Sequence, residues 1–244
     1  MNRNVIKQIA VMVSLGGVLL ALRLWLYGSA VDEKNLLISG HWLSLVIWAA
    51  AVLGLALALI WALGSKETGS IAITGWVCAL GEGLFAGAIC LSVLYMGQVH
   101  STLEILRNAA AYLAAASLLY GAYCRATGKT AFFGCYGAVC LFFVLYLVNI
   151  YRLWSSNPQL MDYFFCLMAC VALTLLSYQN AALSVGIGSR RVWLASGLVA
   201  VCFGIAAASG EGSIVLYLGG AVWALTNLMG ADAAPRNRHA EGER

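Results

Sequence analysis

The chain has 244 residues, of which 62% are hydrophobic and 10% are charged, and its formal net charge is +4. Soluble domains are about 45–50% apolar and about 25% charged, and disordered chains are poor in apolar residues. The composition therefore excludes a soluble globule and a disordered chain. It predicts a protein that lies within a lipid bilayer.

Long apolar runs follow one another along most of the chain. The hydrocarbon core of a bilayer is about 30 Å thick, so a spanning helix needs roughly 20 apolar residues. The runs lack the alternation of barrel strands, and we predict an all-α transmembrane bundle with eight spans. The eight runs are Ile9–Tyr27, Trp42–Leu63, Ile71–Met96, Leu103–Tyr123, Phe132–Tyr151, Tyr163–Val185, Val192–Ala208 and Ser213–Met229. They form one predicted domain over residues 1–230, followed by a disordered polar cytoplasmic tail over residues 231–244.

The first run also has features of a cleavable signal. A basic segment, Met1–Gln8, precedes the apolar residues, and Gly28-Ser29-Ala30 resembles a small-residue cleavage site. Cleavage of residues 1–30 would leave seven spans and an external N-terminus. Arg23 would interrupt the apolar region of such a signal, so we favour a retained first span.

The third run contains a carboxylate, Glu82, about 17 Å from its inner end and so close to the bilayer centre. A charge at that depth is costly, and it is expected to face the bundle interior. Gly81, Gly83 and Gly87 lie around it and allow another helix to approach closely. Two interpretations remain open, a functional carboxylate or a neutral Glu82 that hydrogen-bonds to a neighbouring helix.

The sixth run carries two adjacent amides, Gln179 and Asn180, in its inner third. Adjacent residues on a helix point about 100° apart, so at least one amide is expected to face protein. Helix–helix hydrogen bonding is the favoured interpretation, and a substrate contact is the alternative. The last two runs are about 17 residues each, at the lower limit for spanning, and a re-entrant pair is the alternative there.

The basic residues predict the orientation of the bundle. With the N-terminus in the cytoplasm, ten of the fourteen basic residues lie inside: Arg3, Lys7, Lys66, Arg125, Lys129, Arg190, Arg191, Arg236, Arg238 and Arg244. The positive-inside rule then places both termini in the cytoplasm, which requires an even number of spans.

Ionisable side chains gather at the predicted outer edge of the bundle. The members of this predicted outer rim are Arg23, His41, His100, Glu104, Arg107 and Asp162. Glu104 and Arg107 are spaced to pair on one helix face, and Arg23 can reach headgroups or a carboxylate. Two histidines with a carboxylate could hold a metal ion, but their spacing matches no metal motif. We therefore predict a solvated rim with no metal, no cofactor and no catalytic residue.

Three short segments carry a family resemblance. They are Asp32-Glu33-Lys34-Asn35-Leu36-Leu37 with Gly40-His41, Met161-Asp162-Tyr163-Phe164-Phe165, and Ser189-Arg190-Arg191. With them the chain resembles a group of uncharacterised multi-pass membrane proteins of anaerobic Gram-positive bacteria. The resemblance implies a plasma-membrane location and no particular activity.

Three functional classes remain. The first is a small-solute or ion transporter, or a permease component, in which Glu82 couples transport to protons or cations and Gln179 and Asn180 contact the cavity. The second is a non-catalytic assembly partner or sensor, in which Glu82 and its glycines dock a membrane-protein partner or a second copy. A lipid-modifying enzyme ranks last, because the common hydrolase and nucleotide-binding motifs are missing. The lipid bilayer is the predicted environment, and no nucleic acid is expected to bind.

Overall fold

The computed structural model describes residues 3–29, 41–65, 71–73, 75–95, 101–129, 132–154, 160–209 and 214–233. Eight α-helices dominate these residues. They are α1 (Arg3–Ser29), α2 (Trp42–Leu63), α3 (Trp76–Tyr95), α4 (Thr102–Ala126), α5 (Phe133–Trp154), α6 (Leu160–Ser184), α7 (Arg190–Ala206) and α8 (Ile214–Met229). A short 3-10 helix, η1 (Ala207–Ser209), extends α7, and two short strands, β1 (Ile71–Ile73) and β2 (Ala231–Ala233), pair with each other.

Each of the eight predicted apolar runs overlaps one of these helices, although the exact ends differ. In the described part of the chain, six helices are long and apolar enough to cross a membrane, namely α1, α2, α3, α5, α6 and α7 with η1. The protein is therefore a multi-pass integral membrane protein. Helix α8 is shorter, and α4 falls outside the six although it has 25 residues. Eight crossings thus stay a prediction.

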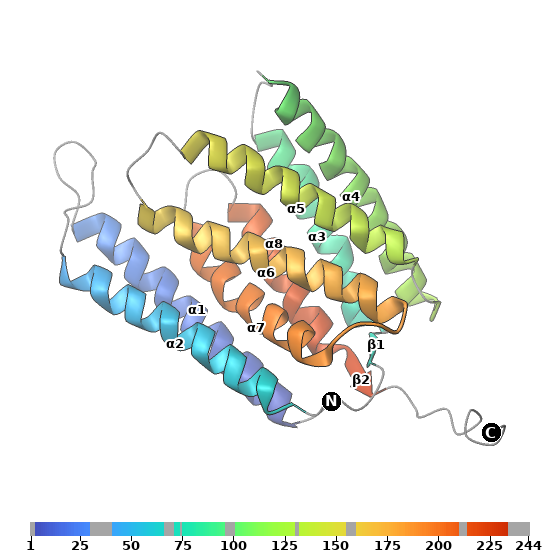
Figure 1. The fold of residues 1–244 in the computed structure, drawn as a ribbon, viewed down its shortest axis with the longest axis horizontal. Coiled ribbons are helices and arrows are strands. Elements are labelled where there is room, and N and C mark those ends of the chain that lie inside the picture. Colours follow the sequence, from blue (N-terminus) through green and yellow to red (C-terminus); the bar gives the residue numbers. More distant parts are fainter. Residues whose placement is uncertain are drawn as a thin grey trace.

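Six helices close into a ring. Helices α3, α4, α5, α6, α7 and α8 each pack against the next, and α8 packs back onto α3. Helices α1 and α2 form a hairpin outside this ring and pack on α7 (Figure 1). We call helices α3 to α8 the six-helix ring.

Helix α7 is the most enclosed span because it contacts α1, α2, α6 and α8. Small residues allow this close packing. A Cβ atom added at Gly204 would lie 3.0 Å from the Tyr217 carbonyl oxygen of α8, and one added at Gly16 of α1 would lie 2.8 Å from the Cys202 carbonyl oxygen of α7. The outward faces of the helices carry exposed leucine and valine side chains, as expected for helices that contact lipid.

The first and last helices of the bundle place their terminal ends close to each other. The start of α1 and the end of α8 lie at the same end, where β1 pairs antiparallel with β2 (Figure 1). Two predictions differ from this structure. The third helix begins at Trp76 rather than at Ile71, and Ala231–Ala233 form a strand where a disordered tail was expected. Backbone hydrogen bonding between the two segments is what orders them. The remainder of the predicted tail lies outside the described residues.

Candidate functional site

Glu82 forms a buried ion pair with Arg125. The Nε atom of Arg125 lies 2.8 Å from Oε1 of Glu82, and the two side chains are 5% and 0% exposed. Glu82 is six residues from the start of α3, about 9 Å along its axis, so it is nearer the helix end than predicted. Arg125 was predicted to lie in an inner connection, but it belongs to the last turn of α4 and points into the protein.

Two further side chains complete the hydrogen bonding of this pair. The Tyr136 hydroxyl of α5 donates to Oε1 of Glu82 at 2.9 Å and accepts from Nε of Arg125 at 3.0 Å, as well as from Nη2. Nη1 of Arg125 donates to Oδ1 of Asn227 on α8 at 3.0 Å. We call these four residues the Glu82 cluster. It joins α3, α4, α5 and α8 at the end of the bundle that carries β1 and β2.

One oxygen of Glu82 has no hydrogen-bond partner. Oε2 is buried, and it lies against Gly121 of α4, where an added Cβ atom would come within 3.0 Å. Gly81, next to Glu82, similarly packs against Thr226, since a Cβ atom there would overlap its side chain. The two glycines let three helices close around the carboxylate. The site therefore encloses a charged acceptor with spare hydrogen-bonding capacity, which is costly in a low-dielectric interior.

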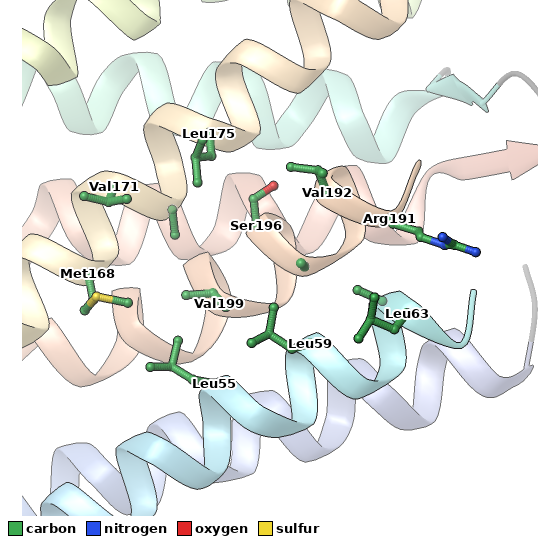
Figure 2. A pocket seen from close by; sticks show the side chains of 13 residues that line it. Leu55, Leu59, Leu63, Met168, Val171, Leu175, Arg191, Val192, Ser196 and Val199 are labelled. Atoms are coloured by element: carbon green, nitrogen blue, oxygen red, sulfur yellow. The ribbon is translucent and has the colours of Figure 1, made fainter. Parts of the chain in front are cut away.

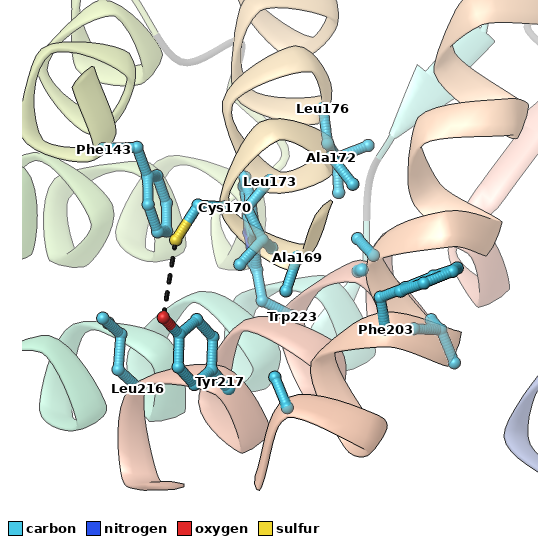
Figure 3. Packing of buried hydrophobic residues seen from close by; sticks show 14 of the residues in the cluster. Phe143, Ala169, Cys170, Ala172, Leu173, Leu176, Phe203, Leu216, Tyr217 and Trp223 are labelled. Atoms are coloured by element: carbon cyan, nitrogen blue, oxygen red, sulfur yellow. Dashed lines mark hydrogen bonds between the residues drawn. The ribbon is translucent and has the colours of Figure 1, made fainter. Parts of the chain in front are cut away.

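The interior of the ring beyond the cluster is aromatic, with scattered polar atoms. Phe85 stacks on Trp223 with ring centroids 5.0 Å apart, and Nε1 of Trp223 is buried without a partner. One and a half turns away on α8, the hydroxyl of Tyr217 lies 3.7 Å from the Cys170 Sγ atom (Figure 3). From Tyr217 to Asn227, buried polar groups thus extend along about 15 Å of α8.

The same arrangement is found on α5. Tyr136, Tyr146 and Asn149 are all buried, over about 20 Å of helix. Near the opposite end of the ring from the Glu82 cluster, Arg107 of α4 is buried and donates to Oδ1 of Asn108 at 2.9 and 3.1 Å. Polar side chains therefore occur inside the ring from one end to the other.

Gln179 and Asn180 lie apart from the Glu82 cluster. Oε1 of Gln179 accepts from the backbone nitrogen of Ser189 at 3.1 Å, and Oδ1 of Asn180 accepts from Nε1 of Trp193 at 2.8 Å. Both amides are buried. Their partners belong to the start of α7 and the residue before it, so both amides link α6 to α7, while Nδ2 of Asn180 is buried without a hydrogen-bond partner.

The predicted outer rim is not a single solvated surface. Arg23 is 1% exposed, because its guanidinium donates to the Ala206 carbonyl oxygen and lies 4.6 Å over the Phe165 ring. Arg107 is also buried, so these two arginines do not belong to a solvated rim as predicted. Neighbouring helices supply Arg23 with an acceptor and an aromatic face that replace water, whereas Arg107 takes its acceptor from Asn108 on its own helix.

The remaining rim residues have local roles or are not described. Nδ1 of His41 accepts from the backbone nitrogen of Leu43 and caps α2, and Glu104 forms a capping box with Ser101 at the start of α4. His100 and the side chain of Asp162 lie outside the described residues. Among the groups that are described, no three potential ligands gather to hold a metal ion. The absence of a metal ion stays a prediction, because His100 lies outside the described residues.

Sequence reasoning missed three members of the Glu82 cluster. Arg125 was assigned to the membrane edge, and Tyr136 and Asn227 are ordinary residues for helix ends. One signal was available, because a buried carboxylate in lipid needs a cationic or hydrogen-bonding partner at similar depth. Glu82 lies within two turns of the start of α3 and Arg125 within one turn of the end of α4, and these two helix ends are at the same end of the bundle.

Comparisons of this chain with protein-family models, with curated proteins and with solved structures find no match. The chemistry of the site therefore rests on its own geometry.

Proposed function

We propose that this protein is a small-solute or ion permease in which the six-helix ring carries the transport path. The Glu82–Arg125 pair closes that path at the end of the ring where α1 starts and α8 ends. The observation that carries the proposal is the enclosure of this ion pair by four different helices, with one carboxylate oxygen left unpartnered.

A charged pair in this position is suited to a gate. Its attraction holds α3 and α4 together, and the hydrogen bonds of Tyr136 and Asn227 add α5 and α8. Protonation of Glu82 would remove the attraction, and a cation that reached the carboxylate would compete with it. The unpartnered Oε2 is the atom where a proton or cation could bind without first breaking a hydrogen bond. Opening would then require Arg125 to lose its partner, which couples binding to helix movement.

The polar side chains inside the ring support a path rather than an isolated clamp. Tyr217 of α8 and Tyr146 of α5 both lie about 15 Å from the Glu82 cluster, with ring centroids 6.5 Å apart, and Arg107 of α4 lies about 27 Å from it. An apolar bundle held together by packing alone needs no such series, because buried polar groups are costly in lipid. The ring interior also holds aromatic side chains, since the Phe85 ring stacks on Phe143 at 6.0 Å and on Trp223 at 5.0 Å between centroids.

The test is proton flux into proteoliposomes under an imposed pH gradient and membrane potential, read by a pH-sensitive dye inside the vesicles. We expect Glu82→Gln to remove the dependence of the flux on pH, because the amide keeps the shape of the side chain but can neither take up the proton nor form the ion pair that closes the path. Lys7→Gln is the control, since Lys7 is exposed on α1, outside the six-helix ring, and loss of its charge should leave flux unchanged. A wild-type dependence of the flux on pH in a folded Glu82→Gln protein would refute the coupling role. If that single variant fails to fold, the neutral pair Glu82→Gln/Arg125→Gln answers the same question.

A second function, that of an assembly partner, is favoured by a different face of α3. Gly87 is exposed, and a Cβ atom added at Gly83 or Gly87 would meet nothing within 4 Å. Such a face allows a helix of another protein or of a second copy to approach closely. Glu82 would not take part, because its partners are all within the chain, whereas the sequence had suggested that it docks the partner.

Native purification with cross-linking distinguishes this second function. We expect Gly83→Leu/Gly87→Leu to abolish any complex that the wild type forms, because two leucines prevent close approach. Gly137→Leu, at another exposed glycine with open space on α5, should leave the complex intact. A wild-type protein that is strictly monomeric, with no copurifying species, contradicts this function.

A further inference from the structure

A groove of about 350 Å³ lies between α2, α6 and α7, outside the six-helix ring (Figure 2). Leu55, Leu59 and Leu63 form its α2 side, and Met168, Val171 and Leu175 form its α6 side. These leucines lie on successive turns of α2 over about 12 Å, so the groove follows the helix axis. Its volume falls in the range of small-molecule sites.

The groove opens toward the membrane rather than into the protein. Leu59 and Leu63 are 55% and 67% exposed, and Val171 and Leu175 are also exposed. Helix α2 is the least buried of the six membrane-crossing candidates. A ligand would therefore enter sideways from the lipid, and its bound part must be apolar.

One end of the groove is positively charged. Arg191, in the first turn of α7, lies at this end, beside Leu63 (Figure 2). Its Nε atom donates to the Ser65 carbonyl oxygen at 3.3 Å, which holds the guanidinium at the mouth of the groove. Ser196 also lines the groove, but its hydroxyl donates to the Trp193 carbonyl oxygen, so it offers the ligand no donor.

The charged end of the groove lies at the start of α7, where we expect the membrane–water interface. Arg190 and Arg191 begin α7, and the N-cap residue Ser189 makes no side-chain cap hydrogen bond. The partial positive charge of a helix start therefore adds to the two guanidinium groups. A negative group bound there would sit at headgroup level, with its apolar part along α2 and α6.

We propose that this groove binds an anionic phospholipid of the surrounding membrane. One acyl chain lies along Leu55, Leu59 and Leu63, and the phosphate-bearing headgroup contacts Arg191. The combination of an apolar channel with a single cationic end matches the division of such a lipid into chain and headgroup.

The test is native mass spectrometry of the full-length protein in detergent, titrated with phosphatidylglycerol or with phosphatidylcholine. We expect one phosphatidylglycerol to bind in preference to phosphatidylcholine. Arg191→Gln should weaken phosphatidylglycerol binding about fivefold, the equivalent of about 1 kcal/mol for one basic residue at an anionic headgroup. Leu59→Trp, which fills the groove, should abolish binding of both lipids at this site.

Two control variants separate the groove from general lipid adhesion. Lys129→Gln removes another exposed basic residue, and Leu84→Trp adds bulk to the exposed face of α3; neither should change the bound lipid. Equal retention of the two lipids, or unchanged binding by folded Leu59→Trp, would overturn the proposal. So would a wild-type dimer that Leu59→Trp dissociates, because a second copy would then cover the groove.

Discussion

At the scale of single residues, the buried guanidinium groups of Arg125 and Arg23 are balanced by partners on other helices. Arg125 meets Glu82, Tyr136 and Asn227, and Arg23 meets a backbone carbonyl and an aromatic ring. Asn227 and Ala206 are more than 100 residues away from the arginines that they contact. The stability of the bundle should therefore depend on the pairing more than on either charge alone.

A mutant cycle tests this dependence. We expect Arg125→Gln to lower the free energy of unfolding by about 3–5 kcal/mol, because Glu82 is left as an uncompensated buried charge. The double variant Glu82→Gln/Arg125→Gln should regain most of that loss, since two amides can hydrogen-bond without charge. Denaturant unfolding in detergent micelles measures both. Strict additivity of the two single variants would show that the side chains do not interact.

The Glu82 cluster could be predicted only in part. Glu82 stands out because it is a lone acid within an apolar run, which is a local property of the sequence. Arg125 does not, because an arginine near the end of a helix suits the membrane interface equally well. Deciding between these positions requires knowing that α3 and α4 pack side by side with Gly121 facing Glu82.

At the scale of elements, helix positions were predictable and their exact ends were not. Eight apolar runs became eight helices because each helix satisfies its own backbone hydrogen bonds. The start of α3 was misplaced because Ile71–Ile73 are as apolar as the helix that follows. Their pairing with Ala231–Ala233 is a long-range contact that no local pattern indicates.

The docking of the α1–α2 hairpin on α7 provides a test at this scale. We expect Gly16→Ala to destabilise the protein by about 1–3 kcal/mol, because the new methyl group would lie 2.8 Å from a backbone oxygen of α7 that cannot move aside easily. Gly17→Ala is the adjacent control, with no atom within 4 Å of its added methyl, and it should be neutral or slightly stabilising. Thermal unfolding of the two variants in one detergent makes the comparison. Equal melting temperatures would mean that α1 does not pack on α7 as described.

At the scale of the whole molecule, we propose that both ends of the chain face the cytoplasm of a plasma-membrane protein. The support is the predicted excess of basic residues on one side, together with the common position of the start of α1 and the end of α8 (Figure 1). Lys129, at the α4–α5 connection, is then inside, and Thr102, at the other end of α4, is outside.

Cysteine labelling in intact cells tests this orientation. A membrane-impermeant maleimide should label Thr102→Cys and leave Lys129→Cys unlabelled until the cells are opened. Both positions are exposed in the structure, and the wild-type protein provides the background from its own eight cysteines, six of which are buried. The reverse labelling pattern would invert the topology. Labelling of both variants in intact cells would mean that α4 does not cross the membrane.

The sequence by itself indicated that this protein is surrounded by lipid, and it indicated the approximate position of each helix along the chain. Both follow from local quantities, namely composition and the length of apolar runs. Only the tertiary structure decided which helices are neighbours, and therefore that Glu82 pairs with Arg125 and that Arg23 is buried. The physical reason is that helix association in lipid depends on close packing and a few polar contacts between distant segments, and neither leaves a strong pattern within one helix.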